Sequence, residues 1–220
     1  VTPLLTVRTL AFEPRIHMLA TRTYDGATST DAYLVVMRDG PIRTLRELDG
    51  KRFCFVDVNS TTGYFLPYAY IIENGFNPDT FIGAIHWSGN HQQVLRDLLS
   101  GQCDAAALTS SAWINAENQG IQTSLLRILT ITGQSPQDSF CASPFVPQAT
   151  QDAVQQAILT FDPLALNLER LGYGLTTFIR PRPELFVPLR LAQYLMWSRS
   201  TARALSQAAL TNTLSGALPL

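Results

Sequence analysis

The chain has 220 residues, a formal net charge of −1 and 46% hydrophobic residues. This length and composition suit one large globular domain or two small ones. The near-zero charge gives no support for nucleic acid or an anionic membrane surface as a partner. There is no signal-peptide pattern at Val1, and no apolar run reaches the roughly 18 residues of a membrane span, so direct membrane insertion is not expected.

The first part of the chain contains two expected strands. The first ends at residues 16–20 and the second covers Ala32 to Met37, and both are rich in aliphatic side chains. Residues 24–30 are rich in Gly, Ser, Thr and Asp, which is typical of a turn. A short helix over Leu45 to Leu48, capped by Thr44, is expected before the next strand.

Residues 52–75 are expected to form a strand, a polar loop and a helix. Phe53 to Val56 are all apolar, which is typical of a strand buried on both faces. The helix should run from about Tyr64 to Glu73, with Pro67 near its first turn. The loop before it contains three adjacent hydroxyl side chains and a glycine: Ser60, Thr61, Thr62 and Gly63.

This loop could bind a small oxyanion. The start of a helix presents unpaired N–H groups and a partial positive charge. Hydroxyl donors beside it, and a glycine that lets the backbone approach a ligand, would complete a cradle of neutral donors. No Lys or Arg lies between Val56 and Asp79, and the Walker pattern is absent, which disfavours a nucleotide polyphosphate. Simple capping of the helix stays open as the alternative.

Strand-like and helical segments alternate from residue 52 to residue 131, as in a mainly parallel sheet with helices on both faces. The later expected strands are Phe81 to Trp87, Asp104 to Leu108 and Leu125 to Ile131. The later helices are an amphipathic one opening at His91, with Val94, Leu95, Leu98 and Leu99 on one side, and one capped by Thr109, Ser110 and Ser111 that runs to about Asn118.

The pattern changes after Thr132. Residues 133–147 are expected to be mostly loop, and Thr150 to Phe161 shows helical periodicity. A short helix is expected over Leu164 to Leu171, and a long helical tail runs from Phe186 to about Leu210.

His91 is a second candidate binding residue. It follows a strand and opens a helix, as the hydroxyl loop does, and both loops would open at the carboxyl edge of a parallel sheet, where ligands bind. His91 could donate to the same anion, best when protonated; a surface histidine is the alternative. Tyr24, Tyr33 and Tyr64 could add phenol donors, with core packing as their alternative role. Asp104 is expected to have a structural role.

Catalysis and metal binding have little support. The three cysteines have no zinc or CxxC spacing, Cys54 is expected to pack in the core, and a Cys103–Cys141 disulfide is left open. A catalytic set could be assembled from Cys54 with His91, or from Ser60 with His91 and Asp104, but no nucleophile elbow is present. We therefore assign no catalytic residue, no metal and no cofactor.

Several motifs occur in order along residues 17–136. They are Tyr-Asp-Gly at 24–26, Leu-Arg-Glu-Leu-Asp-Gly-Lys at 45–51, Phe-Val-Asp at 55–57, Ser-Thr-Thr-Gly-Tyr at 60–64 with Pro67, Ser-Gly-Asn-His at 88–91, and Gly101 with Asp104 and Ala105. In this order they resemble the phosphate, phosphite and phosphonate substrate-binding proteins of ABC importers.

The resemblance implies a fold and a location. The fold would be α/β and type II periplasmic-binding-protein-like, with two lobes, mainly parallel sheets and the ligand in the interlobe cleft. Residues 1–43 and 132–220 would form lobe 1 and residues 44–131 lobe 2, with crossovers near 39–44 and 132–136. The location would be periplasmic or otherwise extracytoplasmic. The family normally carries a further strand-helix-strand-helix portion before the residues that match Val1, so lobe 1 is expected to be incomplete.

The resemblance also implies a site and partners. The loop of Ser60, Thr61 and Thr62 would hold the phosphonate oxygens, with His91 donating beside it; the family usually has serine where Thr62 keeps the hydroxyl. The complete candidate set also includes Gly63, Tyr64, Tyr24 and Asp138, the last as a candidate for recognising an amine. The ligand would be a phosphonate, phosphite or phosphate, and the partner an ABC transporter permease. The alternatives are a ligand-sensing module fused to a signalling domain, suggested by the helical tail, and a small hydrolase using Ser60 or Cys54.

Overall fold

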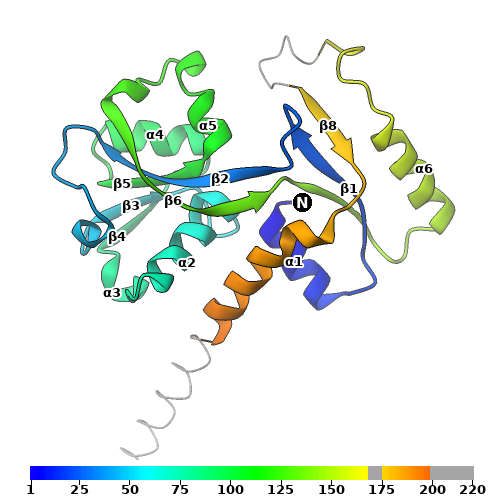
Figure 1. The fold of residues 1–220 in the computed structure, drawn as a ribbon, viewed down its shortest axis with the longest axis horizontal. Helices are drawn as coiled ribbons and strands as arrows, with labels where there is room; N and C mark the ends of the chain where they lie inside the picture. Colours follow the sequence, from blue (N-terminus) through cyan, green and yellow to red (C-terminus); the bar gives the residue numbers. More distant parts are fainter. Residues whose placement is uncertain (168–174, 199–220) are drawn as a thin grey trace, which may run out of the picture.

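The computed structural model describes residues 1–167 and 175–198 of the chain. The described strands form two sheets that lie side by side, each with helices packed against it (Figure 1). The larger sheet has five strands in the order β4-β3-β5-β2-β6, and the smaller has three in the order β7-β1-β8. The α/β architecture expected from the sequence is confirmed.

The strands are β1 (His17–Tyr24), β2 (Ser29–Met37), β3 (Arg52–Phe55), β4 (Ala84–Trp87), β5 (Ala105–Thr109), β6 (Leu126–Pro136), β7 (Ser139–Ala142) and β8 (Thr176–Ile179). The α-helices are α1 (Pro3–Phe12), α2 (Leu66–Glu73), α3 (Pro78–Phe81), α4 (His91–Leu99), α5 (Ser110–Ile114) and α6 (Gln148–Leu159). Four short 3₁₀ helices are described: η1 (Leu45–Leu48), η3 (Glu117–Gln119), η4 (Thr123–Leu125) and η6 (Pro183–Phe186). The segment η2 (Thr61–Phe65) is a single π-helical turn, and residues 187–198 are helical.

The larger sheet is mainly parallel, as expected. β3 pairs in parallel with β4 and β5, while β2 is antiparallel to both β5 and β6, so β2 alone runs against the other four strands. Two apolar clusters cover the faces of this sheet. One is built around Val94, Leu95 and Leu98 of α4, and the other includes Ile71 of α2 and Leu48 of η1. Burial on both faces explains the unbroken apolar runs in the sequence.

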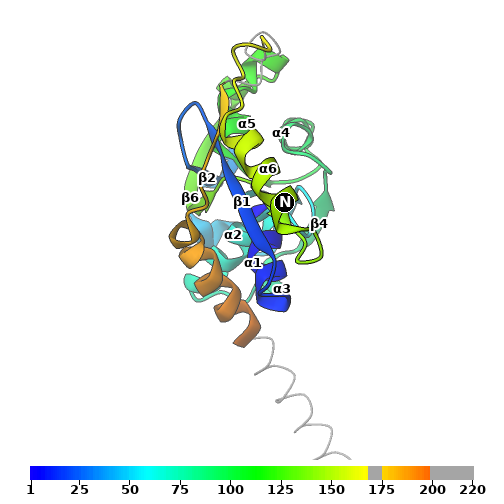
Figure 2. The ribbon, with the colours of Figure 1, turned by 90° about the vertical axis from the view of Figure 1, so that its right-hand side faces the viewer.

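The smaller sheet is antiparallel, with β1 between β7 and β8. Helix α6 runs alongside β1 (Figures 1 and 2). Two side-chain bonds fix this packing: Nδ1 of His17 lies 2.9 Å from Oε1 of Gln151, and Nε2 of Gln155 donates to the carbonyl of Leu19 at 2.7 Å. These bonds attach the first half of β1 to α6.

Two short segments connect the sheets. β1 leads into β2 through residues 25–28, and β6 leads into β7 through residues 137–138. Because β2 pairs along its length within the larger sheet, residues 29–37 lie in the larger sheet, and the first crossover, expected near 39–44, lies at 25–28 instead. The second crossover lies directly after the expected 132–136. Whether the two sheets move as separate lobes stays a prediction.

Helix α1 was not predicted, although its start carries a clear signal. Thr2 is the N-cap, with its side chain accepting from the backbone N–H of Leu5 at 3.4 Å, and Pro3 occupies the first helical turn. Leu4 and Val7 of α1 pack in one buried cluster with residues of η2, α2 and the helix over 187–198. This third cluster joins elements on both sides of the crossovers.

Several boundaries differ from the sequence-based expectation. The helical turn begins at Thr61 rather than Tyr64, because Ser60 caps it. Residues 78–81 form the short helix α3 rather than the start of a strand, since Pro78 favours a first helical turn. The region 133–147, expected to be loop, contains the end of β6 and all of β7, and β8 was not expected. The predicted helix over 164–171 and the tail to 210 lie partly outside the described residues.

Cys54 packs in the core, as expected, but it also forms a disulfide that was not predicted. Cys54 on β3 and Cys103, just before β5, form a disulfide with Cα atoms 5.6 Å apart, and Cys141 is free. The parallel pairing of β3 with β5 brings these two positions together, which spacing along the sequence could not indicate. Asp104 has the structural role expected of it, since its carboxylate binds the guanidinium of Arg52 at 2.9 Å. In the described part of the chain, no helix is both long and apolar enough to cross a membrane.

Candidate functional site

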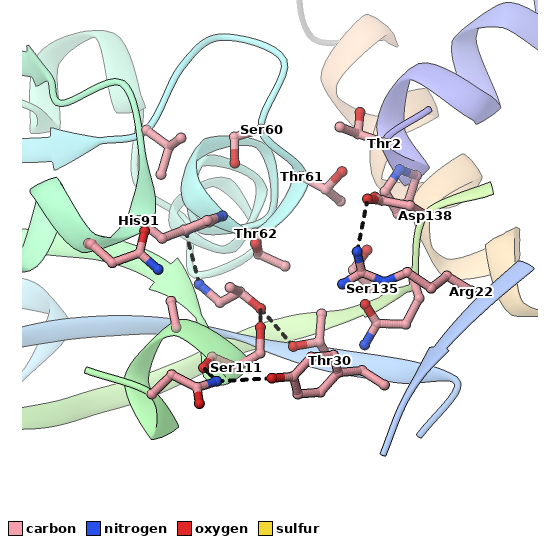
Figure 3. Close-up of a pocket in the computed structure, with 18 of the residues that line it drawn as sticks. Thr2, Arg22, Thr30, Ser60, Thr61, Thr62, His91, Ser111, Ser135 and Asp138 are labelled. Atoms are coloured by element: carbon pink, nitrogen blue, oxygen red, sulfur yellow. Dashed lines mark hydrogen bonds and ion pairs between the residues drawn. The ribbon is translucent and has the colours of Figure 1, made fainter. Parts of the chain in front are cut away.

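A cavity of about 670 Å³ lies between the two sheets. Its walls come from both sides of the crossovers (Figure 3). The smaller sheet contributes the end of β1, and the larger sheet contributes the residues that follow β3, β4 and β5. Six of the eight candidate residues line the cavity: Ser60, Thr61, Thr62, His91, Tyr24 and Asp138. The other two, Gly63 and Tyr64, are not among the lining residues.

The three hydroxyl residues lie at the start of a helical segment that continues from η2 into α2. Ser60 is the N-cap, and its Oγ accepts a hydrogen bond from the backbone N–H of Gly63 at 3.1 Å. Oγ1 of Thr61 accepts from the backbone N–H of Leu4 at 3.0 Å, which ties the turn to α1. All three side chains are buried, and Thr62 faces the same space from the next position (Figure 3). Ser60 therefore caps the helix, as one interpretation expected, and also lines the cavity; that it binds an oxyanion stays a prediction.

Gly63 packs closely against Val56 and Ser60. A Cβ at this position would lie 2.4 Å from Cγ2 of Val56 and 2.8 Å from Oγ of Ser60. Its backbone N–H already donates to Ser60. The space beside Gly63 is therefore filled by Val56, and the close approach to a ligand that the sequence suggested stays a prediction.

Tyr64 belongs to an aromatic cluster. Its ring lies 5.1 Å from that of Phe55 and 5.2 Å from that of Trp87, measured between centroids. Burial raises the pKa of Tyr64, which is consistent with a phenol held among rings. The core-packing alternative considered for this tyrosine is the one the structure shows.

His91 is the first residue of α4 and points toward the hydroxyl turn (Figure 3). Its Nδ1 accepts a hydrogen bond from the backbone N–H of Thr109 at 3.3 Å, which leaves the proton of the neutral ring on Nε2. Burial lowers the pKa of His91 to about 4, against a smaller opposing effect of the Asp57 carboxylate. A pKa this low favours the neutral ring at physiological pH, so any donation to an anion would come from Nε2–H; that His91 donates to an anion stays a prediction.

A third strand end adds hydroxyl groups that were not predicted as binding residues. Oγ1 of Thr30 lies 2.7 Å from Oγ1 of Thr109 and 2.9 Å from Oγ of Ser110. Thr30, Thr109 and Ser111 all line the cavity. The sequence did contain a signal, because Thr109 ends a strand that is parallel to β3, and such ends meet at one edge of the sheet.

Tyr24 closes the cavity from the side of the smaller sheet. Its hydroxyl accepts a hydrogen bond from Nδ2 of Asn115 at 3.2 Å. Asn115 also donates to the carbonyl of Ser111 at 2.8 Å, so the amide bridges α5 and β1 across the cavity wall. Within residues 1–167 and 175–198, the phenol proton of Tyr24 is donated to no recorded acceptor.

Arg22 is the charged residue that the sequence analysis missed. It lies two residues before Tyr24 on β1, so both side chains point to the same face of the strand, and both line the cavity. Its Nη1 lies 4.0 Å from Oδ2 of Asp138. Asp57 also lines the cavity, with Oδ1 accepting from the backbone N–H of Asn59 at 2.7 Å. Over the described residues there is no group of three or more His, Cys, Asp or Glu that could hold a metal.

A sequence model of one protein family matches residues 5–186. Its description is "ABC transporter, phosphonate, periplasmic substrate-binding protein". A curated relative, the probable ABC transporter phosphite-binding protein PhnD1 of Prochlorococcus marinus, is 33% identical over 93 residues, which are 41% of this chain and 31% of the relative. The alignment thus spans about a third of that relative's length.

Solved structures share the fold. The structure of PhnD1 from Prochlorococcus marinus in complex with methylphosphonate aligns with a TM-score of 0.73 and 21% identity, over 88% of this chain and 76% of that one. A binding-protein component of an ABC phosphonate transporter from Pseudomonas aeruginosa aligns with a TM-score of 0.74 and 15% identity, over 98% and 76% of the two chains. At these identities the likeness supports the type II periplasmic-binding-protein fold, while the family match covers most of the chain. The chain belongs to the family of periplasmic phosphonate substrate-binding proteins of ABC transporters.

Proposed function

We propose that this chain binds a small tetrahedral oxyanion, a phosphonate, phosphite or phosphate, in the cavity between its two sheets. One observation carries the proposal: Ser60, Thr61, Thr62 and His91, which come from two different strand ends, line a single cavity. The helical segment after Ser60 and helix α4 both begin there, and helix N-termini favour anions. Neutral donors would set specificity, because a buried donor left without a partner costs about 1–3 kcal/mol.

Tyr24 and Asp138 would complete the site. The Tyr24 phenol can donate to an oxygen of the ligand, and Asp138 remains our candidate for contacting an amine on an aminoalkyl substituent. Gly63 and Tyr64 would act indirectly, by packing the hydroxyl turn against Val56 and Phe55. A cavity of about 670 Å³ has room for a substituent on the ligand.

We further propose that the partner is an ABC transporter permease and that the protein works in the periplasm or another extracytoplasmic compartment. The family description supports both, since it names a periplasmic component of an ABC transporter. The Cys54–Cys103 disulfide fits an oxidising compartment. We propose no nucleic-acid partner and no direct insertion into the membrane.

The two alternatives are weaker. Members of the family are substrate-binding transport proteins, not enzymes. A hydrolase using Cys54 would need a thiol that the disulfide removes, and Nδ1 of His91 accepts from Thr109 rather than from Ser60. The sensor alternative receives no support from the family description, which names a transporter component.

Isothermal titration calorimetry with methylphosphonate, phosphite, phosphate and 2-aminoethylphosphonate tests the proposal. We expect saturable binding of at least one of them at a stoichiometry of one per chain. A folded sample that binds none of the four would overturn the proposed function. If only 2-aminoethylphosphonate binds, and Asp138→Asn abolishes that binding, the amine role of Asp138 is supported.

A further inference from the structure

Arg22 is the only lysine or arginine among the described residues that line the cavity. Its side chain extends from β1 toward the hydroxyl turn, with the guanidinium near Ser135 and Asp138 (Figure 3). The lining also carries two carboxylates, Asp57 and Asp138, so Arg22 offsets only one of their two negative charges. Binding of an oxyanion here therefore depends on whether Arg22 pairs with Asp138 or with the ligand.

The guanidinium of Arg22 makes few hydrogen bonds to the described residues. Nε is buried and has no hydrogen-bond partner within residues 1–167 and 175–198. Nη1 is 4.0 Å from Oδ2 of Asp138, which is close enough for charge attraction but too far for a hydrogen bond. The Cζ atom lies 5.9 Å from the centre of the Tyr24 ring. Arginine has five N–H donors in a rigid fork, so most of them remain available to a bound group.

Asp138 holds its position through the backbone. Its carbonyl accepts a hydrogen bond from the backbone N–H of Arg22 at 2.9 Å, across the second crossover between β6 and β7. The carboxylate thus stays beside the guanidinium with no ligand present. Because the two groups attract each other without a direct hydrogen bond, little free energy is needed for Arg22 to leave Asp138 and bind a ligand that accepts its hydrogen bonds.

We propose that Arg22 is the cation that contacts the ligand, that Asp138 is its internal counter-ion, and that this pair selects doubly charged tetrahedral oxyanions over singly charged ones. A ligand with two negative charges can draw Arg22 away from Asp138 and accept a bidentate pair of hydrogen bonds. A ligand with one negative charge attracts the Arg22 guanidinium no more strongly than the Asp138 carboxylate does. This inference rests on the proposed function. It adds the charge of the preferred ligand and names Arg22 as the residue that recognises this charge.

Calorimetric titrations with methylphosphonate and methanesulfonate test the inference. The two ligands have the same shape, and at alkaline pH methylphosphonate carries two charges where methanesulfonate carries one. We expect the wild-type chain to prefer methylphosphonate. Arg22→Gln should weaken methylphosphonate binding at least about tenfold, the scale of a lost charged hydrogen bond, and should affect methanesulfonate less. Asp138→Asn should strengthen methylphosphonate binding, because it frees Arg22.

Arg15→Gln is the matched control. It also removes one positive charge, but Arg15 pairs with Glu13 and does not line the cavity, so affinity should stay at the wild-type value. Arg22→Gln binding methylphosphonate as tightly as wild type would overturn the inference while leaving the proposed function intact. Weaker methylphosphonate binding in Asp138→Asn would overturn the counter-ion role. If the wild-type chain binds neither ligand nor any other tetrahedral oxyanion, the proposed function fails, and the inference with it.

Discussion

Single residues show which parts of a site a sequence can reveal. Thr62, a hydroxyl residue next to a helix start, and His91, which opens the next helix, were predicted as binding residues, and both line the cavity because the fold brings strand ends together. Their role in binding stays a prediction. Arg22 was missed, although its spacing of two from Tyr24 places both on one strand face. The lowered pKa of His91 could not be predicted from the sequence, because burial is set by the surrounding three-dimensional structure rather than by neighbours in the sequence.

The lowered pKa of His91 predicts a pH dependence of stability. The pKa falls from an ordinary 6.5 to about 4 in the folded protein, so between these values the unfolded chain binds more protons. Stability should therefore be complete above pH 6.5 and should decline as the pH falls toward 4. At pH 4.5 the His91 contribution should be lower than at pH 7 by about 2–3 kcal/mol.

Urea unfolding of the wild-type chain and of His91→Gln at pH 7 and pH 4.5 measures this contribution. Both proteins carry the same carboxylates, so their titration cancels in the comparison. The wild-type chain should lose more stability than the variant on acidification. An equal loss in the two proteins would contradict a buried, neutral His91.

Variants of Thr61 and Thr62 should distinguish a hydroxyl that stabilises the fold from one that only binds the ligand. Thr→Val keeps the shape and removes the donor. Thr61 accepts from Leu4 of α1, so Thr61→Val should lower the unfolding free energy by roughly 1 kcal/mol as well as weaken binding. Thr62→Val should weaken methylphosphonate binding by about 1–3 kcal/mol with little change in stability. Calorimetry and urea unfolding read both quantities, and unchanged affinity in Thr62→Val would remove Thr62 from the site.

At the scale of elements, the strongly periodic segments were predicted well. Helix α4 (His91–Leu99) matches the expectation drawn from its leucines, and α6 (Gln148–Leu159) matches within two residues. Short strands such as β7 and β8 were missed, because four residues give too little periodicity to detect. Helix α1 was missed despite its Thr-Pro start, since an apolar segment suits either a strand or a helix.

The disulfide should be a main source of stability for the larger sheet. It links β3 to the segment before β5 across a sequence separation of 49 residues. In the chain-entropy model, closing a loop of this length lowers the entropy of the unfolded chain and raises the free energy of unfolding by about 4 kcal/mol. The double variant Cys54→Ala/Cys103→Ala should unfold at a markedly lower urea concentration than the wild-type chain.

Cys141→Ser is the control, because Cys141 is free and its removal leaves the disulfide in place. Its unfolding midpoint should stay near that of the wild-type chain, and only the wild type and this control should be destabilised by a reducing agent. A double variant as stable as the wild-type chain would show that the bond contributes nothing.

For the whole molecule, the arrangement of two sheets joined by two crossovers followed from family resemblance rather than from periodicity. Its detail needed the structure: β2 lies in the larger sheet, and residues 25–28 and 137–138 form the connections. A third buried cluster, with Leu4, Phe65 and Leu189, joins α1, the turn after Ser60 and the helix over 187–198. Long-range pairing of this kind leaves no local signal in the sequence.

Ligand binding is expected to bring the two sheets closer together. The cavity of about 670 Å³ is large for methylphosphonate, so tight contact on all sides requires the walls to approach. The crossovers at 25–28 and 137–138 would serve as hinges. Small-angle X-ray scattering should show a smaller radius of gyration at saturating methylphosphonate than without it. An unchanged radius would indicate a rigid site that binds without closure.

A crystal structure of the chain with methylphosphonate tests the central claim most directly. We expect the phosphonate group in the cavity between the sheets, with its oxygens at about 2.7–3.1 Å from Oγ1 of Thr62 and Nε2 of His91. A ligand bound elsewhere on the molecule, or a cavity that stays free of phosphonate at concentrations that saturate binding in solution, would contradict it.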